Sequence, residues 1–409
     1  MITKKMRLKS FAFFTIPLLI SFILWADIDS IGADPGGMEL KVRVLEGRIE
    51  RDAAFSSNGP LSVSLGGREI KISDEKLNVT ALEGGELEIN VGDKKYTAPG
   101  DIEIRSGGGA PLTIAFDRKE IKPRSYSYSY RGRLRIYNDK GAVAVINIVP
   151  VEDYLYSVVA SEISTRELEA TKAQAILSRT YALGNLGRHG GYDFCDKTHC
   201  QHYGGAGIET ALSVRAVDET RGRVLFFNGK TARVFYHACC GGVTTAPAHV
   251  WGGDDPPYLK PVVCRLPGRG GHLCCGSEHF SWEARIEVDR MKALLSEAFN
   301  LTALGLKIIS RDPSGRVAKF EITGPKAKLI SGEEFRITAG RALGWSTIKS
   351  TLFEMDISGG YYLFQGRGLG HGVGMCQEGA IRLSRLGLSH EEILQFYFPG
   401  TSVGRIGDE

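Results

Sequence analysis

The 409-residue chain lacks a polybasic segment, an internal repeat and a low-complexity stretch. Its formal net charge is only +4, and it falls to about +2 when the N-terminal leader is left out. We therefore do not expect nucleic acid as a partner, because binding phosphates requires clustered lysine and arginine. Beyond the leader, no apolar run approaches the length of a membrane span. With 43% hydrophobic and 24% charged residues, the composition is that of a folded soluble protein.

Residues 1–33 are expected to form a secretory signal peptide. A basic segment precedes the apolar run FAFFTIPLLISFILWA, and SIGAD offers a small-residue cleavage site after Ala33. The alternative is an uncleaved N-terminal anchor, which would be the only contact with the membrane. In both cases the rest of the chain is exported across the cytoplasmic membrane, to the periplasm, the cell wall or the outer face of the membrane.

The pattern of the remaining sequence predicts an α+β fold with two domains. Short alternating runs such as LSVSL, LEINV and LTIAF, separated by turn residues, predict a small all-β domain over 38–125. Strand and helix patterns are mixed over 128–403, where a hairpin around DKG leads into a helix that begins at Pro150. Ser164 and Glu167 match the capping box of a second helix. A glycine-rich turn and two short helices complete this domain.

Glu162 stands out in the stretch SVVASEIS because it continues the apolar stripe of the first of these helices. A carboxylate in that position is costly unless it has a partner or a function. Burial and the nearby helix end would both raise its pKa, as a general acid near neutral pH requires. From periodicity alone, a structural and a catalytic role both remain open.

The segment HGGYDFCDKTHCQH contains two cysteines and three histidines within a short loop. Thiolate and imidazole ligands at such separations suit tetrahedral zinc, although the spacing is not that of a standard zinc finger. A disulfide between Cys195 and Cys200 is the alternative.

Five more cysteines lie between residues 239 and 275, and Cys376 stands alone. In an exported chain, disulfides that pair Cys239 and Cys240 with Cys264, Cys274 or Cys275 are the simpler explanation, and a second metal site is the alternative. Cys376 is expected to serve packing. Around it, the alternating glycines of GRGLGHGVGMCQEGA predict an extended segment that another backbone or a ligand approaches closely.

Several ordered motifs resemble the stage II sporulation protein D family, also called the SpoIID/LytB domain. They are GRLRIYNDKGAVAVINIVPVEDYLYSVVASEISTRELEATKAQAILSRTYAL, FYHACCGGVTT, VWGGDDPPYLKPVVC, GRGLGHGVGMCQEGA and HEEILQFYFPGT. The resemblance covers about residues 128–403. It implies a lytic transglycosylase that cuts peptidoglycan glycan strands, preferably strands without stem peptides, and leaves 1,6-anhydromuramyl ends.

The same resemblance implies roles for particular residues. Glu162 matches the family's catalytic glutamate, and a structural zinc ion is implied at His189, Cys195 and Cys200, with His199 and His202 as alternative ligands. The lactyl carboxylate of muramic acid requires basic or hydrogen-bonding partners. The candidates by motif position are Arg179, Tyr236, His237, His371 and Gln377.

Two other functions fit the same motifs. A zinc-dependent amidase would use Glu162 as a base, with a catalytic ion in the histidine- and cysteine-containing loop. A non-catalytic glycan-binding protein would instead stimulate a cell-wall amidase, as the name amidase enhancer records for some members of the family.

Overall fold

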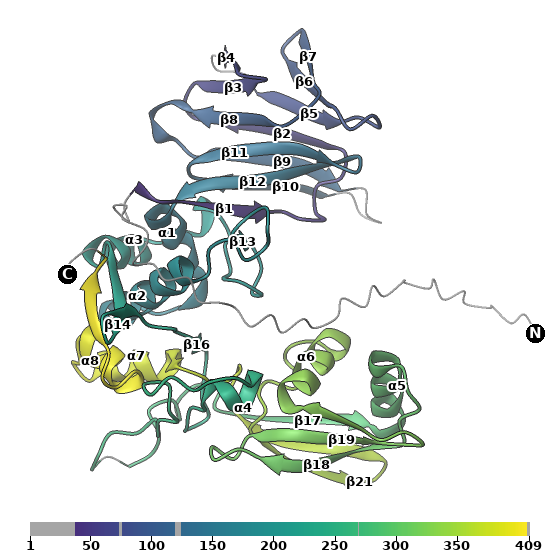
Figure 1. Ribbon diagram of the computed structural model, residues 1–409, viewed down its shortest axis with the longest axis vertical. Helices are drawn as coiled ribbons and strands as arrows, with labels where there is room; N and C mark the ends of the chain where they lie inside the picture. Colours follow the sequence, from purple (N-terminus) through teal and green to yellow (C-terminus); the bar gives the residue numbers. More distant parts are fainter. Residues whose placement is uncertain (1–36, 73–75, 119–123, 269, 407–409) are drawn as a thin grey trace, which may run out of the picture.

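A computed structural model of the chain describes residues 37–72, 76–118, 124–268 and 270–406. The predicted signal peptide lies outside these residues. Figure 1 shows a β-sandwich at one end, a group of helices beside it, and a separate unit of strands and helices at the other end. Within the described residues, every helix is too short or too polar to cross a membrane.

The β-sandwich consists of two sheets whose facing sides form the core. The first sheet has the order β13-β1-β12-β11-β8-β3-β4 and contains β1 (Glu39–Val44), β3 (Leu61–Leu65), β4 (Arg68–Ile72), β8 (Ile102–Ser106), β11 (Arg133–Asp139), β12 (Ala142–Pro150) and β13 (Phe194–Cys195). The second has the order β10-β9-β2-β5-β6-β7 and contains β2 (Asp52–Ser57), β5 (Leu77–Ala81), β6 (Leu87–Val91), β7 (Lys94–Ala98), β9 (Leu112–Arg118) and β10 (Arg124–Tyr130). Alternate residues point inward, as the sequence pattern predicted.

The sandwich continues past the end of the predicted all-β domain. Strands β11 and β12 form the predicted hairpin, with Lys140 and Gly141 at positive φ in its turn. They pair with β8 and β1 in the first sheet. The division expected at 125–128 therefore falls inside one sandwich. Strand β1 and the hairpin share a sheet.

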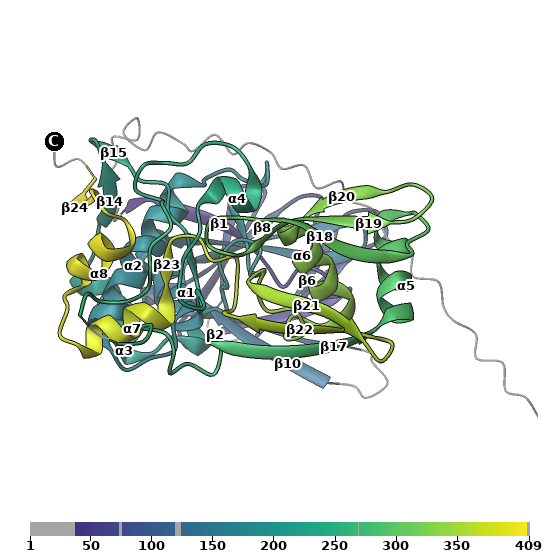
Figure 2. The ribbon, with the colours of Figure 1, turned by 90° about the horizontal axis from the view of Figure 1, so that it is seen from below.

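Five helices form the middle layer: α1 (Val151–Glu162), α2 (Leu168–Gly184), α3 (Ala211–Glu219), α7 (Gln377–Arg385) and α8 (His390–Tyr397). Helix α2 lies among α1, α3, α7 and α8 (Figures 1 and 2). The predicted capping box at Ser164 and Glu167 is wrong: α2 begins only at Leu168, and the backbone N–H of Glu167 donates to Thr165 Oγ1. A small sheet of β14 (Arg223–Phe227), β15 (Lys230–Thr231) and β24 (Ser402–Arg405) borders this layer.

Residues 281–367 form a unit with a hydrophobic core of its own. It contains one sheet of β17 (Ser281–Glu287), β22 (Tyr361–Arg367) and β21 (Phe353–Ser358), a second sheet of β18 (Gly305–Arg311), β19 (Val317–Thr323) and β20 (Lys328–Ser331), and helices α5 (Val288–Phe299) and α6 (Gly332–Leu343). Helix α5 and strand β19 coincide with the predicted segments VDRMKALLSEAF and VAKFEIT. The separate core was not predicted.

The chain returns from this unit through the glycine-rich segment. Strand β23 (Met375–Cys376) pairs in parallel with β16 (Tyr236–His237), a strand that comes before the short helix α4 (Pro247–Trp251) in the chain. A Cβ atom at Gly374 would lie 2.1 Å from Phe235 O, and Gly374 has φ +73°. The predicted close approach of another backbone is therefore confirmed. The segment is not extended, however, because Gly368, like Gly374, has a positive φ.

Candidate functional site

Glu162 is the last residue of α1. The stripe that predicted this helix is buried, including Val151, Tyr154 and Val158, and Glu162 at its end is partly buried. The C-terminal end of a helix carries partial negative charge, which disfavours an ionised carboxylate. No side-chain cation pairs with Glu162 among the residues that the structure describes.

The carboxyl of Glu162 is held by one hydrogen bond from the backbone. The N–H of His202 donates to Oε1 at 3.0 Å. Burial raises the pKa of Glu162 above its usual value, and the bond from His202 opposes that change only in part. Burial also raises the pKa of Tyr236, and the charge of nearby Glu162 raises it further. The sequence therefore predicted correctly that the environment favours the protonated carboxyl.

Tyr236 belongs to a chain of hydrogen-bonded polar side chains. Its hydroxyl accepts a hydrogen bond from Gln201 Nε2 at 3.0 Å. Gln201 also donates to the carbonyl of Ser178 in α2 at 3.3 Å. The Ser178 hydroxyl accepts from Gln174 at 3.0 Å, and Gln174 in turn accepts from Gln377 of α7 at 3.2 Å. Gln201 was not foreseen as part of the site, because a single glutamine in a loop carries no sequence signal.

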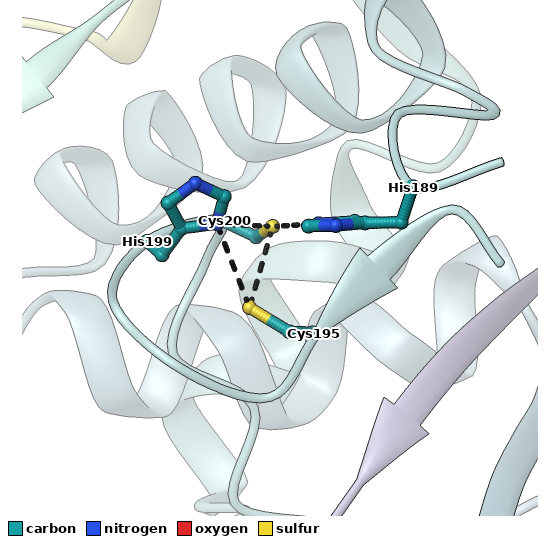
Figure 3. A group of neighbouring side chains, drawn as sticks. All are labelled: His189, Cys195, His199 and Cys200. Atoms are coloured by element: carbon teal, nitrogen blue, oxygen red, sulfur yellow. Dashed lines mark hydrogen bonds between the residues drawn. The ribbon is translucent and has the colours of Figure 1, made fainter. Parts of the chain in front are cut away.

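Four side chains of the loop after α2 converge on one point, as Figure 3 shows. They are His189, Cys195, His199 and Cys200, and their ligand atoms all lie within 4.8 Å of one another. His199, an alternative in the sequence prediction, thus joins the three expected residues. His202 does not belong to the group. Its backbone N–H binds Glu162.

Three of four distances within this group fit a tetrahedral ion, and the fourth, from His189 Nε2 to Cys200 Sγ, is shorter. The two sulfur atoms are 3.5 Å apart, and His189 Nε2 lies 3.1 Å from Cys200 Sγ. His199 Nδ1 lies 3.5 Å from Cys200 Sγ and 3.8 Å from Cys195 Sγ. Sulfur and nitrogen ligands of tetrahedral zinc are separated by roughly 3.4–3.8 Å, whereas a disulfide requires about 2.05 Å. The alternative of a Cys195–Cys200 disulfide is not formed in the structure.

Strand β1 supports this loop. Strand β13 pairs in parallel with β1, with Cys195 opposite Arg43. Asp193 accepts from the N–H of Lys41 at 2.7 Å, and Asp196 accepts from the N–H of Leu45 at 2.8 Å. These contacts give the N-terminal sandwich a structural role in the site that the sequence did not suggest.

Arg179 and Gln377 are placed where they cannot reach a substrate directly. Arg179 is fully buried, and its guanidinium donates two hydrogen bonds to Glu152, at 2.9 and 2.7 Å. It also donates to the carbonyl of Arg223 at 3.0 Å. Gln377 is buried against Gln174. Instead of the predicted contact with substrate, these two side chains make hydrogen bonds inside the protein, to Glu152 and to Gln174.

His237 and His371 lie together, 5.6 Å apart between ring centroids, beside Trp251. His237 is buried; its Nδ1 is 3.0 Å from Val373 O, and its Nε2 has no hydrogen-bond partner within the described residues. Burial lowers the pKa of His371 to about 3, and Arg336 and Arg316 contribute. Burial lowers the pKa of His237 as well, so the charged form of both histidines is disfavoured and a charge-pairing role with a muramyl carboxylate is not supported.

A hollow of about 400 Å³ lies between β10 and the chain that follows the four-ligand group. Its lining includes Arg48, Tyr128, Tyr130 and His202. Glu162 does not line it, but the backbone of His202 connects the two.

Two known protein families match parts of the chain that include the site and the unit with its own core. The SpoIID family, described as stage II sporulation protein, matches residues 139–227, and a domain of unknown function, DUF8618, matches residues 271–374. The second match coincides with the unit that has its own core.

Three relatives extend the match beyond these segments. An uncharacterised protein of Brachyspira hyodysenteriae is 30% identical over 273 residues, which is 65% of this chain and 69% of that protein. The amidase enhancer of Bacillus subtilis is 26% identical over 79% of this chain, which spans only 53% of that protein's length. Stage II sporulation protein D of the same organism is 26% identical over 62% of this chain and 74% of its own length.

Proposed function

The chain belongs to the SpoIID family of stage II sporulation proteins, and on that premise we propose that it is a lytic transglycosylase of peptidoglycan. Family membership supports a function connected with the cell wall. The observation that carries the finer proposal is Glu162, a partly buried carboxyl with a raised pKa, at a helix end and without a cationic partner among the described residues. A carboxyl in such surroundings stays protonated at a higher pH than usual.

Glu162 would act first as an acid and then as a base. Its proton goes to the glycosidic oxygen between N-acetylmuramic acid and N-acetylglucosamine as that bond breaks. The resulting carboxylate accepts the proton of the muramyl C6 hydroxyl, whose oxygen attacks C1 and closes the 1,6-anhydro ring. Because the nucleophile comes from the sugar itself, the paired carboxylates of ordinary glycosidases are not needed.

The tyrosine and amide groups around Glu162 would orient it. The His202 N–H fixes one carboxyl oxygen, which leaves the other free to face the sugar. Tyr236, held by Gln201, would place its hydroxyl near the reacting groups. The hollow lined by Tyr128 and Tyr130 is a candidate for the adjoining part of the glycan strand, because sugars pack against aromatic rings.

The loop with His189, Cys195, His199 and Cys200 would hold a structural zinc ion. Four protein ligands complete a tetrahedral shell and leave no position for water, which is the pattern of structural rather than catalytic zinc. This argues against the zinc-dependent amidase. When bound, zinc would fix the loop whose next residues hold Glu162.

The proposal is tested by incubating the purified protein with peptide-free glycan strands and analysing the chain ends by mass spectrometry. We expect 1,6-anhydromuramyl ends with the wild type and none with Glu162→Gln. A matched control is Glu297→Gln, on the exposed side of α5, which should leave the products unchanged. Reducing ends, or products unchanged by Glu162→Gln, would contradict the proposal.

The amidase enhancer of Bacillus subtilis favours a second function, the stimulation of a cell-wall amidase by glycan binding. In that case the protein alone releases no fragments from glycan strands. Its addition would accelerate release of stem peptides by an amidase to the same extent with wild type and with Glu162→Gln.

A further inference from the structure

Four cysteines distant in sequence meet at a second place in the structure. Cys240, Cys264, Cys274 and Cys376 are all buried, and their sulfur atoms all lie within 4.8 Å of one another. They come from the chain after β16, from two positions in the long segment before β17, and from the residue that caps α7. Cys239 and exposed Cys275 are not members.

We propose that these four cysteines bind a second structural metal ion, with zinc as the ion that the donor set favours. The Cys240 and Cys274 sulfur atoms are 3.6 Å apart. Two thiolates of a tetrahedral zinc ion, each about 2.3 Å from the metal, are about 3.8 Å apart, whereas disulfide sulfur atoms are about 2.05 Å apart. Two separate disulfides would also draw the four sulfur atoms into two pairs rather than one group.

The surroundings of the sulfur atoms suit thiolates rather than disulfides. The N–H groups of Cys240 and Gly379 donate to Cys376 Sγ at 3.3 and 3.4 Å. The N–H of Gly242 donates to Cys240 Sγ at 3.3 Å, and the hydroxyl of Tyr397 lies 3.2 Å from Cys264 Sγ. A thiolate is a much stronger acceptor than a disulfide sulfur, and Cys376 at the first turn of α7 also benefits from the helix dipole.

A buried cation lies beside the group. The side chain of Arg316 is almost completely buried and donates to the carbonyl of Cys240 at 2.6 Å and to that of Val243 at 3.1 Å. Its Nε and Nη1 have no hydrogen-bond partner within the described residues. Asp312, the acidic group close to it, accepts hydrogen bonds from Thr245, Ser314 and the backbone N–H of Arg316 rather than from the Arg316 guanidinium.

Charge balance connects Arg316 to the proposed ion. Four thiolates and one Zn²⁺ carry a net charge of about −2. A buried guanidinium without an ion pair is costly, and an anionic centre next to it would offset that cost. Binding would release the four thiol protons to solvent, so no oxidant is needed. A pair of disulfides, in contrast, would be neutral and would add no negative charge beside Arg316 to that of Asp312.

The first test counts metal on the intact protein. We expect about two zinc ions per chain for the wild type, measured by elemental analysis after purification without chelator. The variant Cys195→Ser/Cys200→Ser, which lacks both loop thiols, should retain about one. Cys376→Ser should contain about one ion fewer than the wild type, and Cys275→Ser, the matched exposed control, should contain as many as the wild type. A loop-thiol variant without metal would overturn the proposal.

The second test needs no variant and therefore holds even if Cys376→Ser does not fold. The wild type is denatured with a chelator and without reductant, alkylated with iodoacetamide and weighed by mass spectrometry. We expect all eight cysteines to be labelled. A deficit of four labels that maps to Cys240, Cys264, Cys274 and Cys376 would mean two disulfides, and the proposal would fail.

Discussion

The backbone N–H of His202 donates to Oε1 of Glu162 at 3.0 Å, and His202 lies two residues after Cys200, a member of the four-ligand group. The proposed acid and the proposed zinc loop are thus separated by only a few covalent bonds and one hydrogen bond. No helix or strand lies between Cys200 and His202, so we expect a change in the loop to alter the position of Glu162.

Removal of one proposed loop ligand should therefore lower the rate of glycan cleavage, while the fold of the whole chain is kept. For Cys200→Ser we expect loss of the loop metal and a fall in the rate of glycan cleavage of roughly 10–100-fold, a magnitude typical when the support of a site is removed. The rate is measured by release of anhydromuramyl products. The same substitution at exposed Cys275 is the control and should have no effect; equal losses for both would indicate that the loop does not act through His202.

The raised pKa of Glu162 sets the direction of the pH dependence. The acid form is lost as pH rises through the folded-state pKa, so cleavage should decline on the alkaline side of that value. The fold holds the proton more tightly than the unfolded chain, so the free energy of unfolding should also fall as pH rises above about 4.5 and level off above the folded pKa.

Urea unfolding at a series of pH values checks this second effect. Glu162→Gln should remove this part of the decline, and the variant should be at least as stable as the wild type above pH 4.5. Glu297→Gln, the exposed control, should keep the decline. A stability profile identical for wild type and Glu162→Gln would show that the carboxyl titrates normally.

The buried pair of Arg179 and Glu152 should contribute strongly to stability. Among the described residues, Arg179→Ala leaves the buried carboxylate of Glu152 with only the N–H of Gly222 as a donor. We expect a loss of about 3–5 kcal/mol in the free energy of unfolding. Arg385→Ala, which breaks a more exposed pair with Glu167, should cost less than about 1 kcal/mol. Comparable losses in the two variants, measured by chemical denaturation, would contradict the structural role given to Arg179.

Tyr236→Phe tests whether the hydroxyl beside Glu162 has a role beyond packing. The ring is retained, but Gln201 loses one acceptor, so the free energy of unfolding should fall by about 1–2 kcal/mol. If the hydroxyl orients the reacting groups, kcat for glycan cleavage should fall by roughly tenfold or more while KM changes little. A rise in KM at unchanged kcat would instead assign Tyr236 to uniform substrate binding.

Local patterns in the sequence predicted single elements well. Strand β3 and helix α5 were recognised because their apolar residues recur with the period of a strand and of a helix. Pairing between distant elements could not be predicted in this way. Strand β13 has only two residues and no recognisable alternation, yet its pairing with β1 brings the N-terminal sandwich to the loop that contains Cys195 and Cys200.

For the candidate site too, residues in local patterns were recognised and contacts between distant residues were not. Glu162 was noticed because a carboxylate continues an apolar stripe, and the histidines and cysteines of the loop because they lie close together in sequence. The catalytic role of Glu162 and the zinc ligands His189, Cys195 and Cys200 came from the family resemblance and remain predictions. Arg179 was misplaced because its partner Glu152 lies 27 residues earlier. Cys376 was assigned to packing because its sulfur neighbours lie in a distant segment, 136 residues from it in the case of Cys240.

The unit with the separate core begins and ends at neighbouring points. Ser281 of β17 pairs with Arg367 of β22, and the N–H of Gly368 donates to Phe280 O at 3.0 Å. Cys274 and Cys376, which flank the unit on either side, belong to the same group of thiols. The chain could therefore acquire, lengthen or lose this unit in evolution without rerouting the rest of the polypeptide, since the two cut ends would already lie side by side.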